Sequence, residues 1–188
     1  LILHTVVSTD SNRIAKIARE YNAETPFIRP DKISQDETQD FPVIHHALKQ
    51  LEKMYSMKID AIVWLRPTSP LRPKKLIEKA IDILNSSPNC TSIRSVIESN
   101  EHPYRQWIIQ DGFIESVFDK EIAHEPYNLP RQKLPKVYLQ SGDIEVVRRE
   151  TILSGSMSGD KVMPLIIKQN EMIDIDHFDD LNKAERII

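Results

Sequence analysis

The chain has 188 residues and a formal net charge of −3, from 25 Lys and Arg against 28 Asp and Glu. This balance gives no reason to expect a nucleic-acid partner, and no apolar run approaches the ~20 residues that span a membrane. Cys90 is the single cysteine, which excludes an internal disulfide and a cysteine-based zinc site and fits a reducing cytoplasm. The length fits one domain, residues 1–188.

The first half of the chain alternates apolar runs with helical patterns. Strands are predicted at residues 5–8, 59–65 and 91–97, and helices are predicted to begin at Ser11, near Pro42 and at Pro73. The run 59–65 is almost continuously apolar, which predicts a central parallel strand covered on both faces. The alternation predicts an α/β fold with a doubly wound, mostly parallel sheet.

The pattern changes in the second half of the chain. Residues 107–114 predict a β-hairpin with an Asp-Gly turn, and a proline-rich stretch at 126–135 leads into a strand at 137–147. An excursion of this kind usually projects from the sheet, and homodimers often use one as a clasp. Residues 98–135 are therefore predicted to form an inserted, β-rich dimerisation arm.

Two loops that follow predicted strands, at residues 8–11 and 66–72, are candidate ligand sites. In open α/β sheets, ligands bind at the carboxyl ends of the strands. The loop 66–72, Arg-Pro-Thr-Ser-Pro-Leu-Arg, is stiffened by proline and offers two hydroxyls and two guanidiniums, which suit an anionic or nucleotide ligand. The alternative is a proline-punctuated turn whose hydroxyls satisfy the amides of the next helix.

A third candidate segment comprises Arg131 and the strand that follows it. A guanidinium matches a carboxylate in a bidentate geometry, so Arg131 is a candidate for binding a carboxylate substrate. Gly142 interrupts the strand pattern at 137–147, which predicts a bulge or a close approach of the backbone to a ligand. The alternative for Arg131 is an exposed basic loop without a ligand.

A pair of acids lies near the C-terminus, where Asp174 and Asp176 stand one residue apart in the sequence Met-Ile-Asp-Ile-Asp. In a strand, alternate side chains share a face, so the two carboxylates are predicted to point the same way. A divalent cation such as Mg²⁺ or Mn²⁺ would relieve the repulsion between them. The alternative is a strand end that runs into the N-terminus of a helix at 177–188, where acids favour the dipole.

Taken in order, five segments resemble motifs of the acylneuraminate cytidylyltransferase family, the CMP-sialic acid synthetases and their relatives. They are Val6-Val7-Ser8-Thr9-Asp10, Leu65-Arg66-Pro67-Thr68-Ser69-Pro70-Leu71-Arg72, Glu101-His102-Pro103-Tyr104-Arg105, Arg131-Gln132-Lys133-Leu134-Pro135 and Ile173-Asp174-Ile175-Asp176. The resemblance covers almost the whole chain, from about residue 6 to the C-terminus. It implies a fold like that of the nucleotide-diphospho-sugar transferases and a homodimer joined through the arm.

The resemblance also implies an activity, the transfer of CMP from CTP to the anomeric hydroxyl of a nine-carbon, sialic-type keto-sugar acid, with release of pyrophosphate. Asp174 and Asp176 are implied to hold Mg²⁺ or Mn²⁺ on the phosphates, with Arg131 as a further catalytic residue. The nucleotide is implied to be bound by Asp10, Asp36, Thr38, Arg66, Thr68 and Ser69. The sugar acid is implied to be bound by Arg105, Gln132, Tyr138, Ser141 and Gly142, with Arg105 reaching the neighbouring subunit's site.

The sequence departs from the family pattern at two places beside the implied sugar site. Ser141-Gly142-Asp143-Ile144-Glu145 stands where the family usually has Asn-Gly-Ala-Ile-Tyr, and Arg66 replaces the usual Gln. Both changes alter the polarity there. The acceptor is therefore expected to be a relative of sialic acid, such as legionaminic, pseudaminic or another nonulosonic acid.

A larger departure concerns the family's first loop, of the type Ala-Arg-x-Gly-Ser-Lys, which has no counterpart in this sequence. The chain as written is therefore expected to be N-terminally incomplete, or spliced across missing residues. A polypeptide that begins at Leu1 is expected to bind CTP poorly and to turn over negligibly. Two alternatives stay open: a non-catalytic, ligand-binding homologue, and a related nucleotidyltransferase that uses another triphosphate or an eight-carbon acid such as Kdo.

Overall fold

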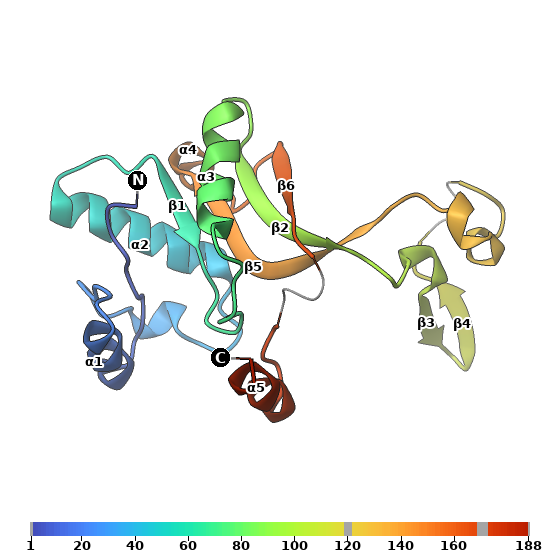
Figure 1. Ribbon diagram of the computed structural model, residues 1–188, viewed down its shortest axis with the longest axis horizontal. Helices are drawn as coiled ribbons and strands as arrows, with labels where there is room; N and C mark the ends of the chain where they lie inside the picture. The colour runs from blue at the N-terminus through green and yellow to red at the C-terminus, as the bar shows by residue number, and fades with distance from the viewer. Residues whose placement is uncertain (1, 119–121, 169–172, 188) are drawn as a thin grey trace. The chain divides into compact units, whose positions relative to one another are not determined.

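The computed structural model describes residues 2–118, 122–168 and 173–187 (Figure 1). Its helices are α1 (Asn12–Glu20), α2 (Asp40–Tyr55), α3 (Leu76–Ser86), α4 (Arg149–Leu153) and α5 (Phe178–Glu185). Its strands are β1 (Ala61–Trp64), β2 (Ser92–Glu98), β3 (Trp107–Gln110), β4 (Phe113–Ser116), β5 (Tyr138–Arg148) and β6 (Val162–Ile166). Within these described ranges, no helix is long and apolar enough to cross a membrane.

Four of the strands form one sheet in the order β1-β5-β2-β6. β1 lies at an edge of this sheet, pairs with β5 and is only partly buried, so the prediction of a central strand at 59–65 is wrong. Packing explains the apolar run, because Ile62 and Trp64 pack against a buried cluster to which α2 contributes two residues. An apolar run therefore predicts that a strand is covered, but not where it lies in the sheet.

β2 and β6 run parallel. The amide of Thr91 donates to the carbonyl of Lys161 (2.9 Å), and farther along both segments the amide of Ile167 donates to the carbonyl of Val96 (3.0 Å). Residue numbers rise together along the two segments, which defines a parallel pair.

β5 runs against both of its neighbours. It pairs antiparallel with β1. Against β2, the amide of Arg148 donates to the carbonyl of Thr91 (3.2 Å), whereas the amide of Ser99 donates to the carbonyl of Val137 (3.0 Å). β1, β2 and β6 therefore share one direction. The predicted α/β class is confirmed, with a mixed sheet in which β2 and β6 are parallel neighbours.

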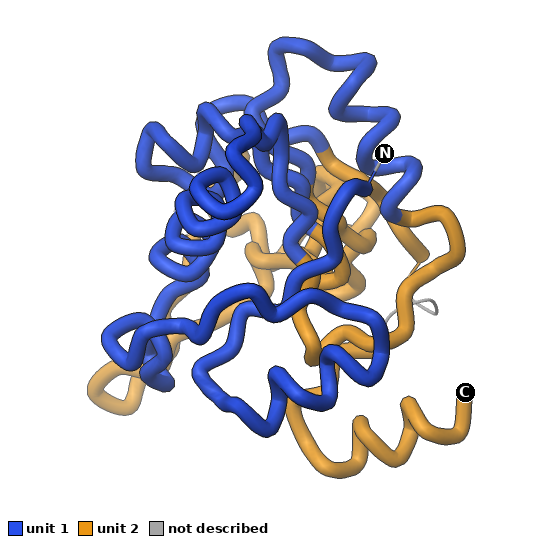
Figure 2. The backbone as a smooth tube through the Cα atoms, turned by 90° about the vertical axis from the view of Figure 1, so that its left-hand side faces the viewer, with its two compact units in different colours: residues 1–64, 77–93, 145–163 blue, residues 65–76, 94–144, 164–188 orange. Residues whose placement is uncertain are grey.

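The chain divides into two compact units, each assembled from segments that are separated in the sequence (Figure 2). Unit 1 comprises residues 1–64, 77–93 and 145–163. Unit 2 comprises residues 65–76, 94–144 and 164–188.

Unit 1 has its core where α2 lies along β1 (Figure 1). Ile44, Leu48, Val147 and Ile152 are fully buried there. The predicted start of α1 is confirmed, because Ser11 Oγ accepts a hydrogen bond from the Ile14 amide (3.3 Å). The predicted strand at 5–8 contributes only one described bridge, between Val6 and Glu24.

Arg148, at the end of β5, links this strand to α3 and to the turn that follows α3. Its guanidinium donates to the backbone carbonyls of Leu84 (2.6 Å), Cys90 (2.7 Å) and Ser87 (3.2 Å). The last carbonyls of a helix have no partner inside the helix, so one arginine satisfies the end of α3 and the turn that leads to β2.

In unit 2, β3 and β4 form the predicted hairpin. Asp111 and Gly112 take φ values of +51° and +81°, as a type I′ turn requires. The ring of Trp107 packs on that of Tyr127 with centroids 4.6 Å apart, which links the hairpin to the proline-rich stretch. The hairpin nevertheless presents apolar side chains to solvent, with Ile109 78% and Phe113 76% exposed.

Candidate active site

The loop 66–72, in unit 2, is held in shape by Arg72. Nε of Arg72 donates to the backbone carbonyl of Asp143 (2.7 Å), and Nη2 donates to the backbone carbonyl of Arg66 (2.5 Å). The amide of Ser69 closes a turn onto the same carbonyl of Arg66 (3.3 Å). Ser69 is fully buried, and its hydroxyl has no hydrogen-bond partner in the described part of the chain. The loop thus carries a fixed, unused hydroxyl.

Gly142 brings the backbone of β5 against this loop and against the acidic segment. Its φ of +76° lies in the left-handed region that favours glycine, so the predicted irregularity within the strand is confirmed. A Cβ atom at this position would lie 3.6 Å from Ser69 Oγ and 3.8 Å from Asp174 Oδ2. Three segments that are distant in sequence therefore meet at one point.

The acidic segment reaches this point without forming a strand. Residues 173–175 have no regular secondary structure, so the strand predicted there is wrong. The amide of Ile175 instead donates to the carbonyl of Thr68 (2.8 Å), which satisfies it from the loop and not from a strand ladder. Asp174 is half-buried with its Oδ1 lacking a described partner, whereas Asp176 is exposed. The prediction that the two carboxylates share one face assumed a strand, and residues 173–176 do not form one.

The segment then enters α5, as predicted. The backbone amide of His177 donates to Asp180 Oδ2 (3.2 Å), and the side chain of His177 accepts from the backbone of Asp180, which together form a capping box. The helix start is thus fixed by its own residues, directly after Asp176.

Ser95 joins β2 to β5 beside Gly142. Its hydroxyl accepts from Ser141 Oγ (2.7 Å) and from the amide of Ile144 (3.0 Å), and donates to the carbonyl of Ile144 (3.1 Å). Ser95 and Ser141 are both buried. The implied sugar ligand Ser141 therefore has a structural role in this geometry.

The surroundings of Asp143 shift the pKa of its carboxyl. It is fully buried, and burial raises its pKa above the ordinary 3.8; the Ser141 hydroxyl and the Arg72 charge oppose this rise, and the Asp174 charge adds to it. Burial is the largest of these effects, and the Ser141 hydroxyl donates to Ser95 in the described geometry. Both carboxylate oxygens of Asp143 lack a hydrogen-bond partner among the residues that the structure describes. Burial likewise lowers the pKa of Arg72.

The implied sugar-binding residues of the arm make contacts of their own. Arg131 Nη2 donates to Asn100 Oδ1 (3.2 Å), and Arg105 Nη2 donates to the carbonyl of Leu129 (2.7 Å). Gln132 and Tyr138 are exposed. Each guanidinium is thus oriented by one bond to the arm.

The implied nucleotide ligands of unit 1 lie in two loops. Asp10 forms an ion pair with Arg29 at 3.9 Å, and Thr38 Oγ1 accepts from the amide of Gln35 (3.0 Å). Asp36 is exposed. Asp10 and Thr38 therefore already take part in local structure.

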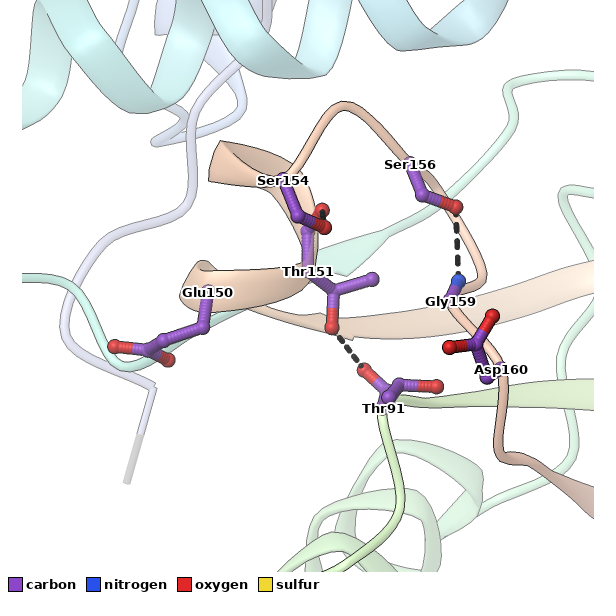
Figure 3. Close-up of a pocket in the computed structure, with 7 residues that line it drawn as sticks. All are labelled: Thr91, Glu150, Thr151, Ser154, Ser156, Gly159 and Asp160. Atoms are coloured by element: carbon purple, nitrogen blue, oxygen red, sulfur yellow. Dashed lines mark hydrogen bonds between the residues drawn. The ribbon is translucent and has the colours of Figure 1, made fainter.

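A separate cavity of about 420 Å³ lies in unit 1 (Figure 3). Its hydroxyls are engaged within the cavity wall: Thr151 donates to the carbonyl of Thr91 (2.9 Å), Ser154 donates to the carbonyl of Thr151 (2.8 Å), and Ser156 accepts from the amide of Gly159 (2.8 Å). The hydroxyls of this cavity are therefore already hydrogen-bonded, whereas Ser69, Asp143 and Asp174 have buried oxygens without described partners.

A divalent cation suits the donors around Gly142. Mg²⁺ prefers oxygen ligands and is usually held by one or two carboxylates, with phosphates and water completing its shell. Asp174 Oδ1 is a buried oxygen without a described partner, as such a site requires. Within the described ranges, no group of three or more His, Cys, Asp and Glu side chains forms a preassembled metal cage.

Three residues of this region were not singled out by the sequence: Arg72, Ser95 and Asp143. Arg72 stood inside the loop motif, and Asp143 stood out only as a departure from the family pattern. Ser95 carried no signal, because its role depends on the pairing of β2 with β5.

Comparisons with known proteins find relatives of the chain, although no protein-family model matches it. The Campylobacter coli post-translational flagellin modification protein B is 30% identical over 191 residues, which cover 100% of this chain and 78% of that protein. The Campylobacter jejuni CMP-N,N'-diacetyllegionaminic acid synthase is 28% identical over 100% of this chain and 78% of its own length.

One solved structure supports the fold. A CMP:2-keto-3-deoxy-manno-octonic acid synthetase complexed with CTP superposes with a TM-score of 0.66 at 11% identity, covering 99% of this chain and 80% of that chain.

Proposed function

Because this chain belongs to the acylneuraminate, or sialic-type, cytidylyltransferase family, we propose that it transfers CMP from CTP to a nonulosonic keto-sugar acid. The anomeric hydroxyl oxygen attacks the α-phosphorus, the bond to the β-phosphate breaks, and pyrophosphate and the hydroxyl proton leave. The observation that carries the proposal is the meeting of Ser69, Gly142 and Asp174 at one point. The proline-punctuated loop, strand β5 and the acidic segment converge there.

We propose Mg²⁺, or Mn²⁺, as the cofactor, held by Asp174 and Asp176. When bound, the cation offsets the negative charge of the triphosphate that would otherwise repel the incoming hydroxyl. The buried, unpartnered Oδ1 of Asp174 supports this assignment. The bond from the Ile175 amide to the Thr68 carbonyl, which joins the acidic segment to the loop, also supports it.

For the nucleotide we propose Arg66, Thr68 and Ser69, together with Asp10, Asp36 and Thr38 from unit 1. The hydroxyl of Ser69 needs a hydrogen-bond partner, which a phosphate or ribose oxygen would supply. Asp10 and Thr38 already bond within unit 1, to Arg29 and to the Gln35 amide.

For the sugar acid we propose Arg105, Gln132, Arg131, Tyr138, Ser141 and Gly142. A guanidinium has five N–H donors, so one bond to the arm leaves Arg131 able to bind the sugar's carboxylate. Since the arm exposes apolar side chains on its hairpin, we propose a homodimer in which Arg105 approaches the neighbouring subunit's site. The single, buried Cys90 is consistent with a cytoplasmic location.

Pyrophosphate release tests the proposal. CTP and GTP are offered with Mg²⁺ and with N,N'-diacetyllegionaminic, pseudaminic, N-acetylneuraminic and eight-carbon keto-sugar acids. We expect release only when CTP is the donor and a nine-carbon acid is the acceptor. Asp174→Asn should abolish this release. If no donor and acceptor pair gives release with the full-length protein, the enzymatic proposal is overturned.

A further inference from the structure

The fold buries the carboxylate of Asp143 without giving it a partner. Asp143 is 0% exposed, and neither Oδ1 nor Oδ2 has a hydrogen-bond partner in the described ranges. The nearby guanidinium of Arg72 donates to backbone carbonyls, one of them that of Asp143 itself. Burial of an unpartnered carboxylate is costly, and proteins balance it with a bound cation, with a paired charge or by protonation.

Other oxygens near Asp143 are also buried without a described hydrogen-bond partner. Its chain neighbour Gly142 places Ser69 Oγ and Asp174 Oδ2 within 4 Å of one point. Ser69 Oγ and Asp174 Oδ1 are themselves buried and without described partners. The charge of Asp174 also reaches Asp143, where it adds to the rise in the pKa that burial causes. Oxygens in need of a ligand therefore come from all three segments that meet at Gly142.

The chemistry and charge of a suitable ligand follow from these oxygens. They are buried carboxylate and hydroxyl oxygens without described partners. Mg²⁺ prefers oxygen ligands and is usually held by one or two carboxylates. A divalent cation also neutralises two carboxylates, which a water molecule does not.

We propose that Asp143 is a ligand of the divalent cation, together with Asp174, and that the Ser69 hydroxyl faces the same ion. The inference rests on the proposed function for the role of the cation in the reaction, but the cation site itself does not require turnover.

Mn²⁺ binding measured by electron paramagnetic resonance, without nucleotide, tests the proposal. We expect Asp143→Asn to weaken Mn²⁺ binding by about tenfold or more. The matched control is Asp82→Asn, which removes an exposed carboxylate on α3 and should bind Mn²⁺ as the wild type does. Wild-type affinity in Asp143→Asn, or no saturable binding by the wild type, overturns the proposal.

Thermal unfolding separates a ligand from a structural carboxylate, whether or not Asp143→Asn changes the stability of the protein without metal. The quantity that decides is the rise in Tm on adding saturating Mn²⁺. A ligand predicts a clearly smaller rise in Asp143→Asn than in the wild type and in Asp82→Asn. An equal rise in all three proteins assigns Asp143 a structural role and overturns the proposal.

Asp143→Cys gives a second readout, because a thiolate prefers soft cations. We expect this variant to lose Mn²⁺ and to bind Cd²⁺ more tightly than the wild type, which controls for the native Cys90. Pyrophosphate release by the wild type stands apart from these measurements. If release fails while Mn²⁺ binding depends on Asp143, the function is overturned and the cation site is retained.

Discussion

The backbone amide of Ile175 donates to the backbone carbonyl of Thr68 at 2.8 Å, which joins the acidic segment to the proline-punctuated loop. The two motifs are more than 100 positions apart in the sequence. Because the bond runs between backbone groups, it fixes the position of Asp174 without using a functional side chain. The site thus depends on a contact that no side-chain pattern reveals.

Ile175→Pro should disrupt this site while preserving the fold. Proline has no N–H to donate, and it restricts the preceding residue, Asp174, to extended conformations. We expect turnover to fall by roughly tenfold or more, since small displacements of a reacting group are costly. Residues 173–175 lie outside the helices and strands, so far-ultraviolet circular dichroism should be unchanged. Ile175→Val keeps the amide and serves as the control; equal turnover in the two variants would show that the bond is dispensable.

Gly142→Ala tests the close approach of β5 to Ser69 and Asp174. The added Cβ would meet both side chains at ordinary contact distances. The backbone φ of +76° at position 142, however, costs a non-glycine residue roughly 1–2 kcal/mol. Gly155→Ala carries a similar backbone cost at φ +93°, with nothing within 4 Å of the new atom. We expect similar losses in urea-unfolding free energy for the two variants, but a loss of kcat/KM only for Gly142→Ala. Matching activities would argue against a site at Gly142.

Ser95→Ala should destabilise the junction of β2 and β5. The substitution leaves the buried Ser141 hydroxyl and the Ile144 amide without their partner, and an unsatisfied buried group costs about 1–3 kcal/mol. Removing the second hydroxyl as well should recover part of that loss, so the double variant with Ser141→Ala should be more stable than the sum of the single effects predicts. Urea unfolding of the four proteins measures this coupling. Simple additivity would contradict the network.

Local signals allowed much of the fold to be predicted from the sequence. The hairpin at Asp111 and Gly112, the cap of α1 at Ser11 and the start of α5 depend on residues close together in the chain. The position of β1 at the edge of the sheet could not be predicted in this way. Its apolar residues can pack against α2 equally well from an edge strand or from a central strand.

The same division holds for the site. The segments around Ser69, Gly142 and Asp174 were identified from motifs, and the structure brings these three residues to one point. The strand predicted for the acidic segment was wrong. Alternation of apolar and acidic residues indicates which side chains are buried, but it does not indicate which carbonyl accepts the hydrogen bond of each backbone amide. The burial of Asp143 depends on long-range packing, so composition and spacing carried no sign of it.

The ion pair of Arg149 with Glu52 should make the stability of the protein sensitive to acid. Arg149 Nε lies 2.6 Å from Glu52 Oε1, and this bond, with help from the Ile59 amide, lowers the pKa of Glu52 below its ordinary 4.5. A lowered carboxyl pKa contributes stability that is fully present above pH 4.5 and is lost as the pH falls through the folded-state value. We expect Glu52→Gln to flatten the fall in Tm below pH 4.5. Glu37→Gln, at an exposed loop position, is the control; an identical acid limb in all three proteins would contradict the assignment.

The exposed hairpin leads to a prediction about assembly. Ile109 is 78% exposed and lies opposite Ile114 on the neighbouring strand, so one apolar pair faces solvent in the single chain. If the arm clasps a second copy, Ile109→Glu would bury an unpaired charge in the interface, which costs several kcal/mol. We expect the wild type to sediment as a dimer at micromolar concentration and Ile109→Glu to sediment as a monomer with an unchanged Tm at low concentration. Ile187→Glu, which places the same charge at another exposed apolar position outside the arm, should remain dimeric. A monomeric wild type would remove the arm's proposed role, and with it the approach of Arg105 to a second site.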